Sequence, residues 1–233
     1  MRDSRSLPRA VVSEAAMRAS VAAAVADGGR VADLRGDAFG HGAIQTARIL
    51  AEAGVAAVVV DDHDVARRLT DIDIVTVLDE APDIDSELLY GLPPASAVSP
   101  MRLMGRVLST KPVRAGEAVS YGHTHRFDAP TTVALVTGGY AQGIVRALGN
   151  HAHVELGGAL HPIVGRVAMD VCVVDLQTTD AETTARLEGA DVVYFGGSGA
   201  IGTSLAQWAA VTGMSAAELI TVAGAKAVRE WTK

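Results

Sequence analysis

The pattern of apolar and polar positions divides the chain into two parts. In the first part, short apolar runs alternate with stretches of helical periodicity and are joined by short connections. We expect strands over 31–34, 55–60 and 72–78 and helices over 14–26, 43–53 and 64–69. Strands that alternate with helices along the chain are typical of a parallel sheet.

The second part begins near residue 101, where glycines and prolines separate short β-rich runs. Two helical stretches close the chain. We expect strands over 103–108, 119–121, 132–136, 154–156, 162–169, 171–176 and 191–195, and helices over 204–211 and 216–223. Many short strands divided by turn residues predict a compact β-barrel or sandwich.

The amino-acid composition changes between the two parts. Residues 79–86 are acidic and loop-like, residues 87–92 are expected to form one more strand, and Pro93-Pro94-Ala95-Ser96 is typical of a linker. We therefore predict two domains, 1–94 and 95–233. The predicted fold class is α/β plus β.

Composition and charge narrow the possible functions. The chain has 233 residues, of which 49% are hydrophobic and 20% charged, which is ordinary for a globular protein. Its net charge of −7 argues against a nucleic-acid partner, because such proteins usually present a basic face. No apolar run approaches the ~18 residues of a membrane helix. The single cysteine, Cys172, is consistent with a reducing compartment, so we expect a cytoplasmic protein.

One motif in the first part carries a family resemblance. Residues 32–42, A-D-L-R-G-D-A-F-G-H-G, resemble the strand and turn of alanine racemases, where a run such as V-V-K-A-D-A-Y-G-H-G supplies a lysine that forms a Schiff base with pyridoxal phosphate. Arg35 stands at the position of that lysine. Phe39 stands where the family has a phosphate-binding tyrosine, and it lacks the hydroxyl.

The exchange of lysine for arginine bears directly on the chemistry. A Schiff-base lysine must lose a proton and attack an aldehyde carbon. A guanidinium stays protonated and has no free amine. The chain has three lysines, Lys111, Lys226 and Lys233, and all of them lie far from residue 35 in sequence. We therefore expect no cofactor, with pyridoxal phosphate retained only if a racemase activity survives.

Three motifs of the second part extend the resemblance. Residues 115–122 read A-G-E-A-V-S-Y-G, residues 139–148 read G-Y-A-Q-G-I-V-R-A-L, and residues 162–170 read P-I-V-G-R-V-A-M-D, and each is similar to a run in alanine racemases. The resemblance implies an alanine-racemase-type C-terminal β-domain. It also implies that Tyr121 is the second catalytic base.

The remaining site residues come from the same motifs. Tyr140, Arg146 and Arg166 match the family's substrate entry route, and Met169 lies where a backbone group helps to hold the substrate carboxylate. Asp170 closes the third motif and belongs to the same substrate-binding set. The alternative interpretation is that these motifs only maintain a β-fold.

The first part is too short for the barrel that the resemblance implies. A (β/α)₈ barrel takes ~250 residues, and only about ninety precede the linker. The resemblance implies barrel strands one to three followed by the last, which Leu88 to Pro93 would form. If the central strands are absent, the resemblance implies that two further features are absent too. These are the family's arginine that contacts the pyridine nitrogen of the cofactor and most of its phosphate-binding loops. The C-terminal phosphate tyrosine falls at about Ala217.

Two hypotheses follow. Racemisation needs two opposed acid-base groups, and only Tyr121 is visible. We therefore favour a catalytically inactive protein with a binding or regulatory role, as a homodimer or as a heterodimer with a full-length racemase. The alternative is a pyridoxal-phosphate-dependent alanine racemase or related isomerase with residual activity. A cut-down barrel should also leave open strand edges, which a second subunit would bury.

Other candidate sites are weaker. His123 with His125, and His151 with His153, have a spacing that two metal ligands on a strand share, but they lie near turns, so we expect no metal site. His41 is interpreted as a structural turn residue. The glycine-rich run 196–202 resembles a phosphate loop only superficially and is expected to be a surface loop.

Overall fold

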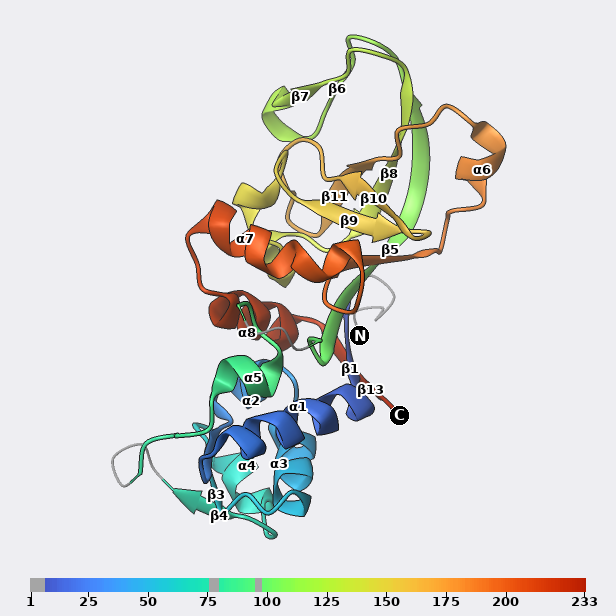
Figure 1. Ribbon diagram of the computed structural model, residues 1–233. Coiled ribbons are helices and arrows are strands. Elements are labelled where there is room, and N and C mark those ends of the chain that lie inside the picture. The colour runs from blue at the N-terminus through green and yellow to red at the C-terminus, as the bar shows by residue number, and fades with distance from the viewer. Residues whose placement is uncertain (1–6, 76–79, 95–97) are drawn as a thin grey trace.

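A computed structural model describes residues 7–75, 80–94 and 98–233 and shows a helix-rich part beside a β-rich part (Figure 1). The elements of the first part are β1 (Arg9–Ser13), α1 (Glu14–Asp27), β2 (Val31–Asp33), α2 (Arg35–Phe39), α3 (Ala43–Glu52), β3 (Ala57–Val59), α4 (His63–Arg68), β4 (Asp73–Val75) and α5 (Ser86–Tyr90).

The second part holds the larger sheet and the C-terminal helices. Its elements are β5 (Met101–Val113), β6 (Ala118–Val119), β7 (His125–Arg126), β8 (Thr131–Thr137), β9 (His153–Leu156), β10 (Ala159–Pro162), β11 (Val171–Asp175), α6 (Ala181–Ala185), β12 (Asp191–Phe195), α7 (Ser204–Thr212), α8 (Ala216–Lys226) and β13 (Val228–Thr232).

The predicted parallel sheet is confirmed. Strands β2, β3 and β4 pair in that order and in parallel, and Val31 lies opposite Ala57, which lies opposite Asp73. Ala32 and Val58 are fully buried and belong to the main core, on the same side as buried residues of α1 and α3. The expected strand over 72–78 is described only as far as residue 75, and its remainder lies outside the described residues.

Local sequence explains where the first helix begins. The hydroxyl of Ser13 accepts a hydrogen bond from the backbone N–H of Ala16 at 3.2 Å, which satisfies one of the free donors at the start of α1. The helix therefore begins at Glu14, where the expected helix over 14–26 also begins.

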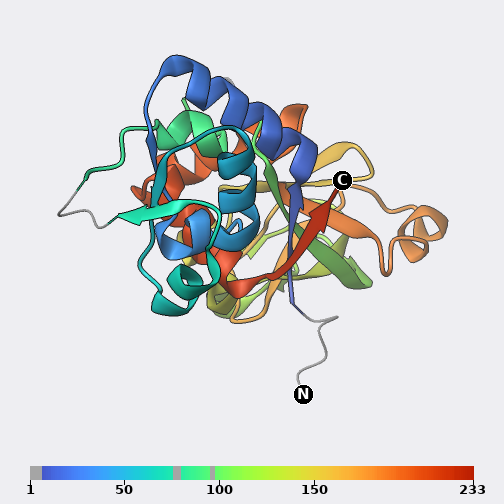
Figure 2. The ribbon, with the colours of Figure 1, turned by 90° about the horizontal axis from the view of Figure 1, so that it is seen from below.

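The two ends of the chain meet in the larger sheet. Strand β1 lies between β5, to which it is antiparallel, and β13, to which it is parallel. Figure 1 shows β1 and β13 side by side between the two parts, and Figure 2 shows the same two strands from below. This pairing was not predicted, because it joins residues more than 200 positions apart. The domain boundary after residue 94 stays a prediction.

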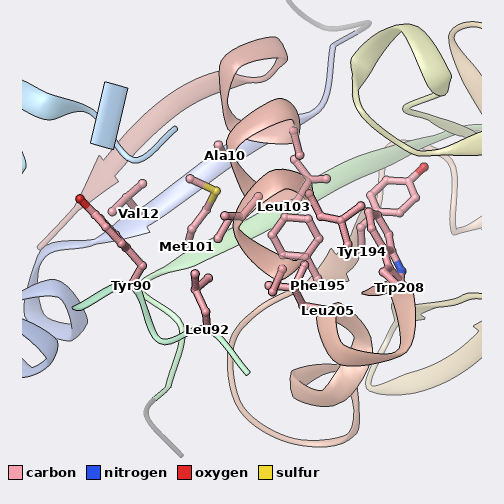
Figure 3. Packing of buried hydrophobic residues seen from close by; sticks show 14 of the residues in the cluster. Ala10, Val12, Tyr90, Leu92, Met101, Leu103, Tyr194, Phe195, Leu205 and Trp208 are labelled. Atoms are coloured by element: carbon pink, nitrogen blue, oxygen red, sulfur yellow. The ribbon is translucent and has the colours of Figure 1, made fainter. Parts of the chain in front are cut away.

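One hydrophobic core runs through both parts of the molecule. Its largest buried side chain is that of Trp208 in α7, which lies against Tyr194 and Phe195 of β12. Figure 3 shows this aromatic group at one end of a continuous row that passes Leu103 and Met101 and reaches Tyr90. The buried residues of α7 and α8 join the same cluster.

The expected strand over 87–92 is wrong, because this segment forms helix α5. The carboxylate of Asp85 accepts hydrogen bonds from the backbone N–H groups of Glu87 and Leu88, and Gly91 ends the helix in the left-handed conformation at φ 59°. Leu89 and Tyr90 are buried. The segment that resembles the family's last barrel strand is therefore a helix here.

The expected strand over 162–169 is also wrong. Strand β10 ends at Pro162, and beyond it a single bridge joins Ile163 to Val174. Gly165 then turns the chain at φ 73°, which interrupts strand geometry. The fold class itself, a partial barrel-like sheet followed by a β-domain, is as predicted.

The outer edge of β2 is covered by the segment that follows the parallel sheet. The Asp83 carboxylate accepts hydrogen bonds from the N–H groups of Arg30 at 2.6 Å and Val31 at 2.7 Å. The N–H groups of Asp83 and Ile84 both donate to the carbonyl of Val31. The expectation that the shortened barrel leaves open strand edges is therefore wrong at the start of β2, where Asp83 and Ile84 bond to the backbone of Val31.

We expect Asp83→Ala to lower the melting temperature at pH 7 by a few degrees. Hydrogen bonds from the backbone N–H groups of Val31 and Arg30 hold the pKa of this carboxyl below 3.8. Its contribution is therefore present at neutral pH and lost as the pH falls through the lowered pKa. Thermal melts at pH 7 and pH 3 measure this effect. The difference in melting temperature between wild type and variant should be smaller at pH 3 than at pH 7. Asp83→Asn, which keeps one acceptor, is the matched control, and an equal gap at both pH values would contradict the assignment.

Within the described ranges, no single helix is both long and apolar enough to cross a membrane. Two consecutive helical segments, Ala200–Thr212 and Ala216–Lys226, are together long and apolar enough by length and composition alone, and the chain bends by 108° between them.

Candidate functional site

The end of strand β2 is closed by an ion pair. The Nε and Nη2 atoms of Arg35 donate to the two carboxylate oxygens of Asp33 at 2.9 and 2.6 Å, and the backbone N–H of Arg35 adds a third bond at 3.0 Å. The Asp33 side chain is 9% exposed and that of Arg35 is 47% exposed. Hydrogen bonds to Asp33 raise the pKa of Arg35 further. Position 35 thus carries a permanent, paired cation.

We expect Arg35→Gln to lower the free energy of unfolding by about 1–2 kcal/mol, because it leaves a nearly buried carboxylate without its counter-ion. The half-exposed guanidinium keeps this below the cost of breaking a fully buried pair. Denaturant unfolding of Arg35→Gln, Asp33→Asn and the double variant forms a thermodynamic cycle. The double variant should recover part of the loss, and additive losses would show that the pair contributes no coupling.

The residues after Arg35 form a left-handed turn. Gly36, Asp37, Ala38, Phe39 and Gly40 all have φ between 52° and 80°. This region is costly for residues with a Cβ, and three of the five have one. Conformations of this kind persist only where surrounding contacts hold them, and they concentrate at functional sites.

The contacts that hold this turn come from distant parts of the chain. Arg229 of β13 pairs with the Asp37 carboxylate and donates to the carbonyl of Gly40 at 3.0 Å. The Asp61 carboxylate, after β3, accepts from the N–H of Gly36 at 2.9 Å. Asp37 also accepts from the N–H of Ala43 at 2.7 Å, which fixes the start of α3.

His41 supports the turn from inside. It is fully buried, its Nδ1 lies 2.9 Å from the carbonyl oxygen of Ala38, and its ring lies 4.8 Å from that of Tyr90. Burial lowers the pKa of His41 to about 4, so the ring is neutral. The Tyr90 hydroxyl donates to the carbonyl of Asp33 at 2.6 Å. These contacts agree with the interpretation of His41 as a structural residue.

An open cleft of about 920 Å³ lies beside the turn. Four carboxylates and three basic side chains line it; these residues are Asp37, Asp61, Asp62, Asp64, His63, Arg68 and Arg229. The Asp62 carboxylate caps α4 by accepting from the N–H groups of Asp64 and Val65. The surface at the ends of β2 and β3 is therefore mainly anionic.

The predicted site residues of the second part lie on its surface. Tyr121 is 68% exposed, Met169 54% and Tyr140 42%. The Arg146 guanidinium lies over the Tyr140 ring at 5.7 Å, which is a cation-π distance. Asp170 accepts a hydrogen bond from the side-chain amide of Gln142 at 2.6 Å.

Backbone contacts join these residues into one region. The N–H groups of Tyr140 and Ala141 donate to the carbonyls of Ala168 and Met169. The Ser120 hydroxyl, next to Tyr121, donates to the carbonyl of Arg166. Figure 1 shows β6 and β7, which flank Tyr121, at the far end of the molecule from α2. One chain therefore does not bring Tyr121 to Arg35.

Several residues at this site were not predicted. Asp33 could have been identified from the sequence, because it is an acidic residue near the end of an expected strand and lies two positions before Arg35. Asp37, Asp61 and Arg229 carried none, because their roles depend on contacts between elements that are distant in sequence. Among the described residues, no group of three or more His, Cys, Asp or Glu is placed to hold a metal ion.

The family model for the alanine racemase C-terminal domain matches residues 100–231, which is more than half of the chain. The chain belongs to the alanine racemase family. It is 41% identical over 143 residues to the alanine racemase of Mycolicibacterium vanbaalenii, a match that covers 61% of this chain and 34% of that relative. The chain spans between 34% and 39% of the length of the curated relatives it matches.

Solved structures extend the likeness to the fold of the first part. The alanine racemase of Streptomyces lavendulae superposes with a TM-score of 0.81 at 20% identity, with 97% of each chain covered. The alanine racemase of Bartonella henselae, solved with covalently bound pyridoxal phosphate, gives a TM-score of 0.76 at 17% identity, covering 97% and 99% of the two chains. At such identities the likeness establishes the fold alone.

The residues at the ends of β2 and β3 do not fit pyridoxal phosphate. The amine is absent at position 35, where the guanidinium is already bonded to Asp33. Phe39, half-buried against Tyr90 at 4.6 Å, offers no hydroxyl. The cleft is lined by more carboxylates than basic side chains, whereas a phosphate is bound by N–H donors and cations.

Proposed function

We propose that this chain is a non-catalytic member of the alanine racemase family that acts as a binding or regulatory subunit. The observation that carries the proposal is the ion pair between Arg35 and Asp33. An imine requires a neutral amine, and a paired guanidinium cannot supply one. The loss of this group removes the covalent step on which the family's chemistry depends.

The distribution of the candidate residues favours an association. Tyr121, Arg146 and Arg166 form an exposed region that is remote from the turn after β2 in the same chain. Exposed tyrosine and arginine side chains are common energetic centres of protein interfaces. The partner is a second copy of this chain or a full-length racemase, and the exposed region would meet the partner's own barrel.

Charge supports contact between unlike parts. Residues 1–94 hold nine basic and sixteen acidic side chains, whereas residues 95–233 hold eleven of each. Like-charged surfaces repel, so two copies should avoid pairing their first parts. A head-to-tail arrangement, in which the second part of one subunit faces the first part of the other, avoids this repulsion.

The test is to mix the purified chain, in stoichiometric excess, with a full-length alanine racemase. Sedimentation velocity should show a new species, and racemase activity should change as it forms. Arg146→Glu with Arg166→Glu is the matched variant, because reversed charge in the exposed region should abolish the new species. Unchanged sedimentation and activity would remove the heterodimer.

The homodimer is tested separately. The chain alone should sediment as a dimer at micromolar concentration. Monomeric behaviour in this range would contradict the homodimer, and monomeric behaviour together with a negative mixing experiment would contradict the proposed function as a whole. We further propose a cytoplasmic location, because a chain with a single cysteine, Cys172, has no internal disulfide and is consistent with a reducing compartment.

An enzymatic role is the second candidate, and one contact favours it. The backbone of Gly224 in α8 lies against that of Gly40 in the left-handed turn, so the fold brings the exposed Lys226 closer to α2 than its sequence position suggests. Incubation with pyridoxal phosphate, borohydride reduction and peptide mapping test this role. Labelling confined to Lys226 and abolished by Lys226→Ala would support it, and absence of a specific label would exclude it.

A further inference from the structure

The loop that carries Tyr121 has a backbone conformation reserved almost entirely for glycine. Ser120 has φ 62° and ψ 177°. In this region the Cβ of any other residue is crowded by its own backbone, so a serine here stores strain. Glycine at position 120 would remove that strain, so serine is not the residue that backbone stability alone would favour.

The serine side chain supplies an attachment that glycine lacks. Its hydroxyl donates a hydrogen bond to the carbonyl of Arg166 in the neighbouring loop. Gly165 permits this approach, because a Cβ on Gly165 would lie 2.7 Å from the Cβ of Ser120. The two loops are therefore fitted to each other at this point.

A second attachment holds the far end of the same loop. The Asn150 side chain donates to the hydroxyl of Thr124 at 3.2 Å and accepts from the N–H of Gly165 at 2.6 Å. Between the two attachments, the N–H of His123 donates to the carbonyl of Ser120 and closes a short turn. Tyr121 thus projects from a segment that is fixed at both ends.

The side chain that this segment presents is exposed. Tyr121 is 68% exposed, the largest fraction among the large hydrophobic residues that the structure describes. The strained backbone and the two attachments therefore hold a phenol that is exposed and does not pack in the core. Preorganisation of this kind lowers the entropy lost on binding.

We infer that Ser120 is a positioning residue, which holds Tyr121 in a preformed orientation for insertion into a partner subunit. This inference rests on the proposed function for its partner, and it adds the device that presents the tyrosine. Ser120 acts through its hydrogen bond to Arg166 and touches no ligand itself.

The first experiment uses the isolated chain and needs no partner. Hydrogen exchange by NMR is measured at the amide of His123 in wild type, Ser120→Gly and Ser120→Ala. We expect exchange about tenfold faster or more in both variants, because the loop is released. The melting temperature should be higher for Ser120→Gly than for Ser120→Ala, since glycine relieves the strain. Unchanged exchange in Ser120→Gly would overturn the inference.

The second experiment measures presentation to a partner. A full-length alanine racemase in which phenylalanine replaces the tyrosine that matches Tyr121 is mixed with this chain, and recovery of racemase activity is followed. Wild type should restore activity and Tyr121→Phe should bind without restoring it. Ser120→Gly should restore activity about tenfold less well at saturation, although it is the more stable of the two Ser120 variants.

The outcomes separate the two claims. A wild-type chain that neither binds nor restores activity contradicts the heterodimer, and the exchange measurement alone then decides the role of Ser120. If wild type and Ser120→Gly restore activity equally, Ser120 is not a positioning residue even where its loop becomes mobile. Recovery that follows the melting temperatures of the variants would indicate a purely structural role and would also overturn the inference.

Discussion

Trp208→Ala is expected to lower the free energy of unfolding by about 3–5 kcal/mol, because it leaves a large cavity in the core. The indole is 1% exposed, and its ring lies 5.3 Å from that of Phe195 and 6.3 Å from that of Tyr194. These rings meet edge to face, which adds to the burial. Figure 3 shows that the group ends the row of side chains that leads to Tyr90.

Denaturant unfolding measures this loss. Val211→Ala on the same helix is the control, because Val211 is 39% exposed and should change stability by about 0.5 kcal/mol or less. A loss below about 1 kcal/mol for Trp208→Ala would show that α7 is not packed as the structure has it.

Gly40→Ala should be the second most damaging change, at about 2–4 kcal/mol. A Cβ at this position would lie 2.8 Å from the Cα of Gly224 and 3.2 Å from the carbonyl oxygen of Ile220, and φ is 80°. The variant therefore combines left-handed strain with overpacking between the turn and helix α8. The loss should be accompanied by faster hydrogen exchange in residues 36–42.

Gly54→Ala separates the two causes. Gly54 has φ 82° and nothing within 4 Å of a Cβ, so its substitution costs only the left-handed strain, roughly 1 kcal/mol. Denaturant unfolding of both variants measures the difference. Equal losses at positions 40 and 54 would contradict the close contact between the turn and α8.

Local sequence was sufficient to predict the parallel sheet and most helices. The cap at Ser13 and Gly54 after α3, which has φ 82°, are short-range signals that act within a few residues. Helix α5 had equally readable signals in Asp85 and Gly91. The segment was expected to be a strand because its short apolar run also fits a strand, and five residues are too few for a helical periodicity to show.

Long-range contacts could not be predicted from sequence. The pairing of β1 with β13, the cover of β2 by Asp83 and the clamp of Arg229 on the left-handed turn all join residues at least 50 positions apart. Neither Asp83 nor Arg229 differs from an ordinary surface residue in its local pattern. The replacement at Arg35 was evident from sequence, whereas its pairing with Asp33 required the structure.

The family fold is compatible with the proposed loss of the family's chemistry. The C-terminal part carries the matching family model, and the strained turn after β2 persists around a changed residue. A fold can outlast the reaction it once served, since function depends on the site that the fold carries. In the proposed function, the exposed Tyr121 region remains as a surface for association.

The most direct measurement is interconversion of L- and D-alanine by the pure chain in the presence of added pyridoxal phosphate, with a full-length racemase as the positive control. Our account predicts no turnover above the rate of free pyridoxal phosphate, in wild type and in Tyr121→Phe alike. Turnover that copurifies with the chain, exceeds that rate and falls in Tyr121→Phe would contradict it.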